Sequence, residues 1–300
     1  MVCIIILNWN NYQDSIDCIE SLKALSKKNF KIVVVDNCST DDSFQKLMRY
    51  ANTNKDIFIS VYQSHKNGGY AYGNNYGINI ALEDTNIHYI WILNNDTIVE
   101  PNSLESLIKK IQSDYQIGIC GSTLIYEHDR RKVQAIGGMY NKWLGTSSHV
   151  LNGELYSNQL CVLHERLELD YIVGASMLVT REFINKVGLL DERYFLYCED
   201  LDWSTRAKRN SFKIAYAPDS IVYHKEGRTT KSSSYNVINS RNITIDKIFL
   251  RSSLLYSMRF QPLHHPIMRL LFIVRAFRRL FDKEPTLAIN AIYCMLFVWS

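Results

Sequence analysis

Asparagine and aspartate side chains follow four apolar runs in the first hundred residues of the chain. Asn8 ends VCIIILN, Asp36 and Asn37 follow KIVVV, a polar stretch at 65–69 follows IFISVYQ, and Asn94 to Asp96 follow IHYIWIL. Carboxylate and amide oxygens bind Mg²⁺ and Mn²⁺, and they accept hydrogen bonds from nucleotide bases and ribose hydroxyls. Because all four runs end in the same kind of side chain, we expect one shared polar crevice.

Two of these ends each allow two interpretations. Asp36 either caps a turn or accepts a hydrogen bond from a base N–H or a ribose hydroxyl. The turn at Asn94-Asn95-Asp96 either caps a helix that begins at Pro101, where proline is favoured in the first turn, or binds a cation. One or two carboxylates plus phosphate oxygens suffice to hold Mg²⁺, so Asp96 could bind a divalent cation that bridges a diphosphate.

A second cluster of acids lies beyond the midpoint of the chain. Glu199, Asp200 and Asp202 directly follow the aromatic stretch RYFLYC. They could serve only as first-turn acids that favour the dipole of the following helix. Crowding acids beside apolar side chains also raises the pKa of a carboxylate, which suits Glu199 or Asp200 to act as a general base. Asp202 falls on the far side of the helix from Glu199 and is expected to compensate the dipole.

His224 ends the last strand-like segment, KIAYAPDSIVYH, which reads as two short strands. A single histidine can be structural, can bind a metal as a neutral imidazole, or can bind phosphate as a cation. Arg228 and Lys231 follow in a loop rich in Gly, Ser and Thr. That loop is either simply solvated or closes over a diphosphate.

Strands that alternate with helices through the first 110 residues predict a doubly wound, mostly parallel sheet. Ligands of such sheets bind at the carboxyl ends of the strands, where the polar ends lie. Ser39 or Thr40 is expected to cap the helix after the second strand. Neither GxGxxG nor the P-loop pattern is present, which counts against a nicotinamide-dependent oxidoreductase.

Composition indicates a globular, cytoplasmic chain of one large domain with an appendage. Seven cysteines occur without a CxxC pair, which predicts reduced thiols. The N-terminal apolar run stops at Asn8 and reads as a buried strand, not a signal peptide. No apolar stretch reaches 18 residues, so no transmembrane helix is predicted.

The C-terminal sixty residues are strongly basic. Nine Lys and Arg against three acids give residues 241–300 a charge of +6, which leaves −2 for the rest of a chain whose net charge is +4. On a helical wheel of 266–281, Leu270, Ile273, Val274, Phe277 and Phe281 share a face, and Arg275, Arg278 and Arg279 lie opposite. This pattern suits either an anionic membrane surface or packing on the preceding domain with a solvated basic face. Residues 287–299 are apolar but too short to span a bilayer.

Six motifs in order carry a family resemblance over residues 1–230. They are IIILNWNN, IVVVDNCSTDDS, NGGYAYGNNYGI, WILNNDTIVEP, the segment from GASMLVTR to EDLDWSTRAKR, and IVYHKEGRTT. The chain resembles family 2 inverting glycosyltransferases of the GT-A fold, and within them the rhamnosyltransferase-like branch. The resemblance implies an α/β fold of the GT-A type, with a mostly parallel sheet flanked by helices and a C-terminal helical extension.

The resemblance also implies roles for individual residues. A divalent cation, Mg²⁺ or Mn²⁺, would be held by Asp96 and His224. Asp200 would be the general base, with Glu199 as the second candidate or as a binder of acceptor hydroxyls. Asn94 stands where many relatives carry Asp, which puts tight metal binding in question. The donor nucleotide would be bound by Asn8, Asn10, Asp36, Asn37, Asn67, Gly68, Gly69 and Asn94.

The expected activity is inverting transfer of a hexosyl group, rhamnosyl above all, to a hydroxyl of a growing cell-surface glycan. The donor would be dTDP-rhamnose or a UDP-sugar, and the acceptor a saccharide or lipid-linked saccharide, with no nucleic-acid partner. Residues 1–230 would form the catalytic domain, divided into a nucleotide-binding half (1–115) and an acceptor-binding half (116–230). Residues 231–300 would form a flexible loop and a basic helical tail on the inner face of the cell membrane. The alternatives are a UDP-hexose-dependent transferase and a catalytically weak scaffold that binds glycans or nucleotides.

Overall fold

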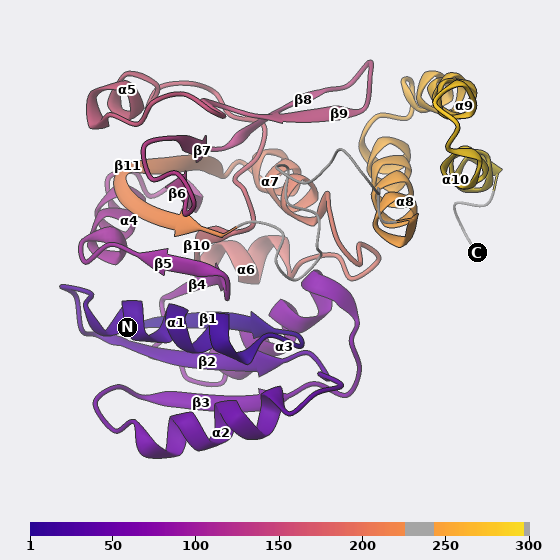
Figure 1. Cartoon of the computed structure of the whole chain (residues 1–300). Helices are drawn as coiled ribbons and strands as arrows, with labels where there is room; N and C mark the ends of the chain where they lie inside the picture. The colour runs from indigo at the N-terminus through magenta and orange to yellow at the C-terminus, as the bar shows by residue number, and fades with distance from the viewer. Residues whose placement is uncertain (226–242, 297–300) are drawn as a thin grey trace.

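One mixed sheet forms the centre of the computed structural model, which describes residues 1–225 and 243–296 (Figure 1). Its strand order is β3-β2-β1-β4-β10-β6-β11-β5, with β7 paired to β6. The strands are β1 (Val2–Asn8), β2 (Phe30–Asp36), β3 (Ile59–Gln63), β4 (Tyr89–Asn94), β5 (Thr97–Val99), β6 (Ile117–Tyr126), β7 (Val133–Ala135), β10 (Ser176–Thr180) and β11 (Lys213–His224). A separate hairpin joins β8 (Gly138–Asn141) and β9 (Thr146–His149).

Helices from the first 210 residues cover both faces of this sheet, and three more follow the sheet domain. They are α1 (Tyr12–Lys23), α2 (Ser43–Thr53), α3 (Gly69–Leu82), α4 (Ser103–Gln112), α5 (Asn158–Leu163), α6 (Arg181–Val187), α7 (Glu199–Arg209), α8 (Ile243–Phe260), α9 (His265–Phe281) and α10 (Pro285–Leu296). Alternate residues of β1 belong to opposite cores, as the period of a strand requires. Ile4 and Ile6 pack with α1, α2 and α4, whereas Cys3 and Ile5 pack with α3, α6 and α7.

The first four strands in the sheet order are parallel, as predicted, and their register aligns the polar ends. Asn8 pairs with Asp36 across β1 and β2, and Leu7 pairs with Asn94 across β1 and β4. β10 then runs antiparallel between β4 and β6. The predicted α/β fold is therefore confirmed, with the mostly parallel pairing concentrated in its N-terminal half.

Two predicted helix starts are wrong. Ser39 and Thr40 do not cap α2, which begins at Ser43, because the Ser39 N–H donates instead to Asp36 Oδ1 at 2.9 Å. α4 begins at Ser103, two residues beyond Pro101, because the short strand β5 first pairs with β11. The turn at 94–96 therefore leads into a strand and caps no helix.

The segment 213–224 also differs from its prediction. It forms the single strand β11, with an irregularity in its pairing with β6 between Ala217 and Ile221. The intervening Pro-Asp-Ser suggested a break between two strands. The sheet accommodates these residues as a bulge, in which extra residues of one strand are left unpaired.

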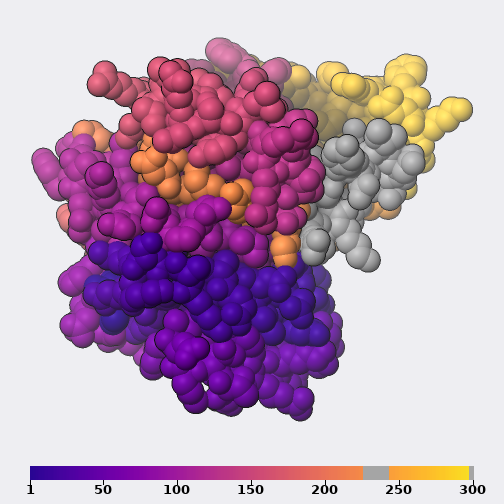
Figure 2. All heavy atoms as spheres, turned by 60° about the vertical axis from the view of Figure 1, so that its left-hand side comes forward, coloured from indigo at the N-terminus to yellow at the C-terminus, as the bar shows by residue number. Residues whose placement is uncertain are grey.

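The helices α8, α9 and α10 follow the sheet domain and project to one side of it (Figures 1 and 2). These three helices share a small apolar core, which contains Leu250, Leu254, Met268, Phe272 and Ala291. The predicted helix at 266–281 is confirmed as α9. The predicted loop with Arg228 and Lys231 lies outside the described residues.

Arg279 is not part of an exposed basic face, contrary to the prediction. It is 5% exposed, and its guanidinium pairs with Asp246 of α8 and donates to the Leu287 carbonyl. A helical wheel gives the spacing of residues along one helix, but it cannot show that a neighbouring helix, here α8, covers the Arg279 side chain. None of the helices in the described ranges is long and apolar enough to cross a membrane.

Candidate active site

Asp36 is the centre of a hydrogen-bond network at the ends of β1 and β2. It is fully buried, and its carboxylate accepts from Asn8 Nδ2 at 2.8 Å and from the Ser39 hydroxyl at 2.6 Å. Gln63, at the end of β3, donates to it at 3.2 Å. The Ser15 hydroxyl of α1 in turn donates to Asn8 Oδ1 at 2.8 Å. This side of the crevice is preformed, because its buried polar groups already have partners.

Asn37 ties this network to the loop before α3. Its amide donates to Asn67 Oδ1 at 3.0 Å and to the Gly69 carbonyl at 3.1 Å. Gly69 has a φ of +88°, and a Cβ there would lie 2.1 Å from the Phe195 carbonyl oxygen. Position 69 therefore requires glycine, because the loop that precedes α7 approaches it closely. A Cβ at Gly68 would meet the Tyr72 ring.

Asn10 is the exposed member of the predicted donor set. Its Oδ1 accepts from the Thr40 N–H at 2.8 Å, and its own N–H donates to the Ser39 hydroxyl at 2.8 Å. Asn10 has a φ of +52°, a conformation that asparagine tolerates better than most residues. These contacts place Asn10 beside the Asp36 network at the rim of the crevice.

Asp96 and His224 face each other at the ends of β4 and β11. Asp96 Oδ1 lies 3.1 Å from His224 Nε2, and both side chains are buried. The other ring nitrogen, Nδ1, lies 2.8 Å from Gln134 Oε1, which can only accept a hydrogen bond. Burial acts to raise the pKa of Asp96, but the His224 imidazole and the Lys225 ammonium outweigh burial and hold that pKa below its usual value.

This pair fits a divalent cation. With Nδ1 donating to Gln134, Nε2 of His224 faces the Asp96 carboxylate, an arrangement in which either the proton of an imidazolium or a metal cation lies between the two atoms. Two ligands bound cis in an octahedron at about 2.1 Å lie about 3.0 Å apart, close to the 3.1 Å seen here. No cluster of three His, Cys, Asp or Glu suited to a metal occurs in the described part of the chain, so the remaining ligands would be phosphate oxygens and water. Asn94 Nδ2, 3.5 Å from His224 Nε2, lies at the rim of this pair.

Glu199 and Asp200 form the first turn of α7, as predicted. Burial raises the pKa of Asp200 to about 6, although the Leu201 and Gly174 N–H groups, which donate to its two oxygens at 2.8 and 3.1 Å, oppose that rise. Burial and the charge of Asp200 raise the pKa of Glu199 well above its ordinary value. Glu199 Oε2 is buried and has no hydrogen-bond partner among the described residues. Two buried carboxyl groups this close disfavour each other's ionisation, so the pair favours a form that holds one proton.

The backbone before α7 is held in an unfavourable conformation. Tyr197 and Cys198 have φ values of +70° and +66°, and neither is glycine. Each residue held outside its favoured region costs about 1–3 kcal/mol and persists only where its surroundings enforce it. The acids of α7 are thus presented by a constrained turn.

The turn that leads into β10 brings the two groups of acids together. The Asn94 N–H donates to the Ala175 carbonyl at 3.0 Å, and the Gly174 N–H donates to Asp200. The Tyr70 hydroxyl donates to the Gly174 carbonyl at 2.6 Å. Burial raises the pKa of Tyr70, and the charges of Glu199, Asp200 and Asp96 raise it further. The acid that follows β4 and the two acids that begin α7 therefore surround one hydroxyl.

Three site residues were not predicted from the sequence. Gln134 orients His224, Tyr70 bridges β10, and Ser39 binds Asp36. Tyr70 adjoins the predicted Gly68-Gly69, and Ser39 was read only as a helix cap. Gln134 carries no signal in the sequence, because it reaches His224 across 90 residues. Asp202 is not a simple dipole acid either, since it is fully buried and paired with Arg206 and Arg259.

The sheet and its flanking helices have the GT-A fold. The mannosyltransferase PcManGT from Pyrobaculum calidifontis, solved in complex with GDP-Man and Mn²⁺, superposes with a TM-score of 0.60 at 14% identity, covering all of this chain and 88% of that one. That similarity shows the fold.

The sequence then gives the family. Residues 3–187 match the model of glycosyl transferase family 2, and the chain belongs to that family. The rhamnosyltransferase WbbL of Escherichia coli (strain K12) is 28% identical over 78% of this chain and 88% of its own length. The N-acetylglucosaminyl-diphospho-decaprenol L-rhamnosyltransferase of Mycobacterium tuberculosis is 25% identical over 70% of this chain and 71% of its own. The protein is therefore a glycosyltransferase of the rhamnosyltransferase-like branch.

Proposed function

We propose that the protein transfers a rhamnosyl group, with inversion, from a nucleotide-diphosphate sugar to a hydroxyl of a saccharide or lipid-linked saccharide. The observation that carries this proposal is a path of two hydrogen bonds: the Asn94 N–H donates to the Ala175 carbonyl, and the N–H of the adjacent Gly174 donates to the Asp200 carboxylate. It holds a candidate cation site and a candidate base on the same crevice. The names of the two curated relatives support the rhamnosyl group, and the decaprenol in one of those names supports a lipid-linked acceptor.

Asp200 is the base in this proposal. Its carboxylate takes the proton of the acceptor hydroxyl while the acceptor oxygen forms a bond to the anomeric carbon and the bond from that carbon to the diphosphate breaks. Direct displacement from the opposite face inverts the anomeric centre. Above about pH 6 Asp200 is ionised, as a base must be. Burial and the charge of Asp200 raise the pKa of Glu199, which favours the form that can donate a hydrogen bond to an acceptor oxygen.

Asp96 and His224 hold the divalent cation in this proposal. A bound cation would neutralise the charge that develops on the departing diphosphate. Asn8, Asn10, Asp36 and Asn37 bind the nucleotide, since their network lines the ends of the strands where such ligands bind. The loop of Asn67, Gly68 and Gly69 completes this side, and Asn94, whose amide lies 3.5 Å from His224 Nε2, would bind the nucleotide next to the candidate cation site.

A panel of dTDP-, UDP- and GDP-sugars with and without Mn²⁺ or Mg²⁺ tests the proposal. The donor should raise the melting temperature, because a ligand that binds only the folded state stabilises it. The same donor should be consumed when acceptor is added, and the Asp96→Ala variant should lose the metal-dependent part of the stabilisation. Stabilisation by a UDP-hexose alone would favour a different donor. Stabilisation without turnover for any donor and acceptor would favour a binding scaffold.

The helices α9 and α10 supply a surface for the lipid partner. Leu270, Val274, Phe277 and Phe281 of α9 are 62, 62, 60 and 86% exposed, and Ile289 of α10 is 64% exposed. Arg275 and Arg278 also lie on α9, and the first turn of that helix has no acid. We propose that this surface lies on an anionic membrane at its inner face, because an apolar face beside cations suits the bilayer interface.

Flotation with anionic liposomes tests this surface. The triple variant Leu270→Ser, Val274→Ser and Phe277→Ser should lose most of the flotation, because these side chains are already exposed and the fold does not need them. Leu163→Ser, at a residue 72% exposed on α5, is the matched control and should float like the unmodified chain. Equal recovery of the triple variant would exclude this surface as the membrane contact.

A further inference from the structure

The helix α8 belongs to the C-terminal extension, yet its contacts converge on the segment that presents Glu199 and Asp200. Its Ser252 hydroxyl donates to the Leu196 carbonyl at 2.8 Å, one residue before the left-handed pair at 197 and 198. Tyr256 packs with Tyr194 and Leu201, and its hydroxyl lies 2.8 Å from the Thr205 hydroxyl of α7. The extension therefore covers the outer side of α7.

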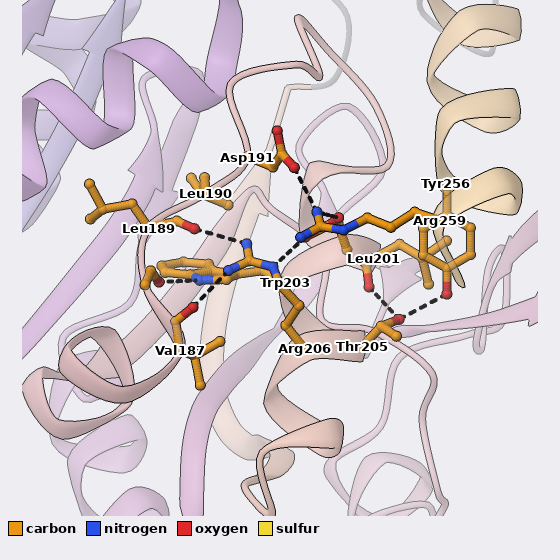
Figure 3. A network of polar contacts seen from close by, with 12 residues as sticks. Val187, Leu189, Leu190, Asp191, Leu201, Trp203, Thr205, Arg206, Tyr256 and Arg259 are labelled. Atoms are coloured by element: carbon orange, nitrogen blue, oxygen red, sulfur yellow. Dashed lines mark hydrogen bonds and ion pairs between the residues drawn. The ribbon is translucent and has the colours of Figure 1, made fainter. Parts of the chain in front are cut away.

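Arg259 links three parts of this region by charge. Its Nη1 lies 2.6 Å from Asp202 of α7 and 2.6 Å from Asp191, which precedes the constrained turn (Figure 3). The same Asp202 accepts from Arg206 Nε at 2.5 Å, and Arg206 also donates to the carbonyls of Val187 and Leu189 (Figure 3). Arg259 thus fixes both the start of the loop and the helix to which it leads.

The position of Asp202 makes this contact important. Asp202 is fully buried and lies two residues after Asp200 on the same helix. A buried charge that loses a partner is strongly destabilised, so the helix and the loop shift to recover solvent or another cation. Glu199, with no hydrogen-bond partner for its Oε2, and Asp200, held by only two N–H groups, would move with them.

We propose that Arg259 is a positioning residue for the catalytic acids: by binding Asp191 and Asp202 together it holds the turn at 197–198 and the first turn of α7 in the reactive arrangement. This inference rests on the proposed role of Asp200. It assigns α8 to the catalytic unit and leaves α9 and α10 as the surface-binding part. A truncation meant to test the surface must therefore retain residues 243–260.

The test compares Arg259→Ala with Arg209→Ala. Arg209 is exposed at the far end of α7, and its Nη2 donates to the Phe260 carbonyl of α8 at 3.2 Å, so its removal breaks the same interface away from the acids. Misplacing a catalytic group by about 1 Å costs about 100-fold, so Arg259→Ala should lower kcat about 10–100-fold. The donor KM should not change, and Arg259→Lys, which keeps the charge, should recover most of the rate. Arg209→Ala should match the unmodified enzyme.

Donor-binding stoichiometry by calorimetry gives the folded fraction, so that kcat refers to folded enzyme in every variant. If Arg259→Ala does not fold, Asp191→Asn removes one anchor while Asp202 keeps both arginines, and the same selective loss of kcat is expected to a smaller degree. An unchanged kcat in the variant that folds, an equal loss in Arg209→Ala, or a parallel rise in donor KM would overturn the inference. An unmodified enzyme that transfers from no donor would instead reject the proposed function.

Discussion

The two sides of the crevice differ in how their polar groups are satisfied. On the nucleotide side, Asp36 is fully buried but accepts hydrogen bonds from Asn8, Ser39 and Gln63. On the base side, Glu199 Oε2 has no hydrogen-bond partner among the described residues. The two preceding residues, Tyr197 and Cys198, have a left-handed backbone conformation. The first arrangement suits binding of a ligand to a preformed surface. The second keeps carboxyl groups ready to exchange protons, at a cost in stability that the surrounding contacts must offset.

The largest effect should come from Asp200→Asn. Removing the base should lower kcat about 10²–10⁴-fold, the range typical of general acid–base catalysis. Donor affinity should stay the same, because Asp200 contacts none of the nucleotide-side residues. Turnover assays and calorimetry with the donor measure the two quantities. Glu199→Gln is the matched control: it makes the same carboxyl-to-amide change at the neighbouring acid, so its loss should be smaller if Asp200 is the base, and a larger loss would exchange the roles of the two residues.

Asp36→Ala should break the nucleotide side by a different route. It leaves the buried Asn8 amide and the Ser39 donors without their acceptor, and buried groups left unsatisfied cost about 1–3 kcal/mol each, or about 3 kcal/mol here. Urea denaturation should show this loss of unfolding free energy, together with weaker donor binding. Gln63→Ala removes one longer, partly buried hydrogen bond and should cost far less. Equal losses in the two variants would show that the network is not organised around Asp36.

The smallest effect in this series should come from Gln134→Ala, between the two sides. Gln134 orients His224 without touching the cation, and loss of such an orienting partner typically costs about 10–100-fold in metal affinity. Titration of activity with Mn²⁺ should show that weakening, while nucleotide binding without metal stays constant. An unchanged Mn²⁺ dependence would mean that His224 does not hold the cation.

The sequence predicts the nucleotide side better than the base side. Asn8, Asp36 and Asn94 could be placed together because the ends of parallel strands meet at one edge of a sheet, and the register confirms it. The acids at 199 and 200 were found because their crowding beside aromatic residues is unusual. Their roles in donor binding and catalysis stay predictions.

What the sequence could not show are contacts made across long stretches of chain. Gln134 reaches His224, Arg259 reaches Asp202, and Arg279 is buried against Asp246 instead of facing solvent. Ser39 and Thr40 are residue types that often cap helices, but their N–H groups donate to Asp36 and Asn10 near the ends of the neighbouring strands. Local spacing predicts elements, whereas partners depend on which elements the fold brings together.

The pH dependence of turnover tests the account most directly. The raised pKa of Asp200 means that the base is lost as pH falls through about 6. The folded pKa lies above the unfolded value of about 3.9, so folding favours the protonated form, and the enzyme should lose stability relative to Asp200→Asn as pH rises from about 4 through about 6. With donor binding monitored separately, kcat/KM should fall to half near pH 6. Activity that persists unchanged down to pH 4, where an ordinary aspartate titrates, would contradict the assignment of Asp200 as the base.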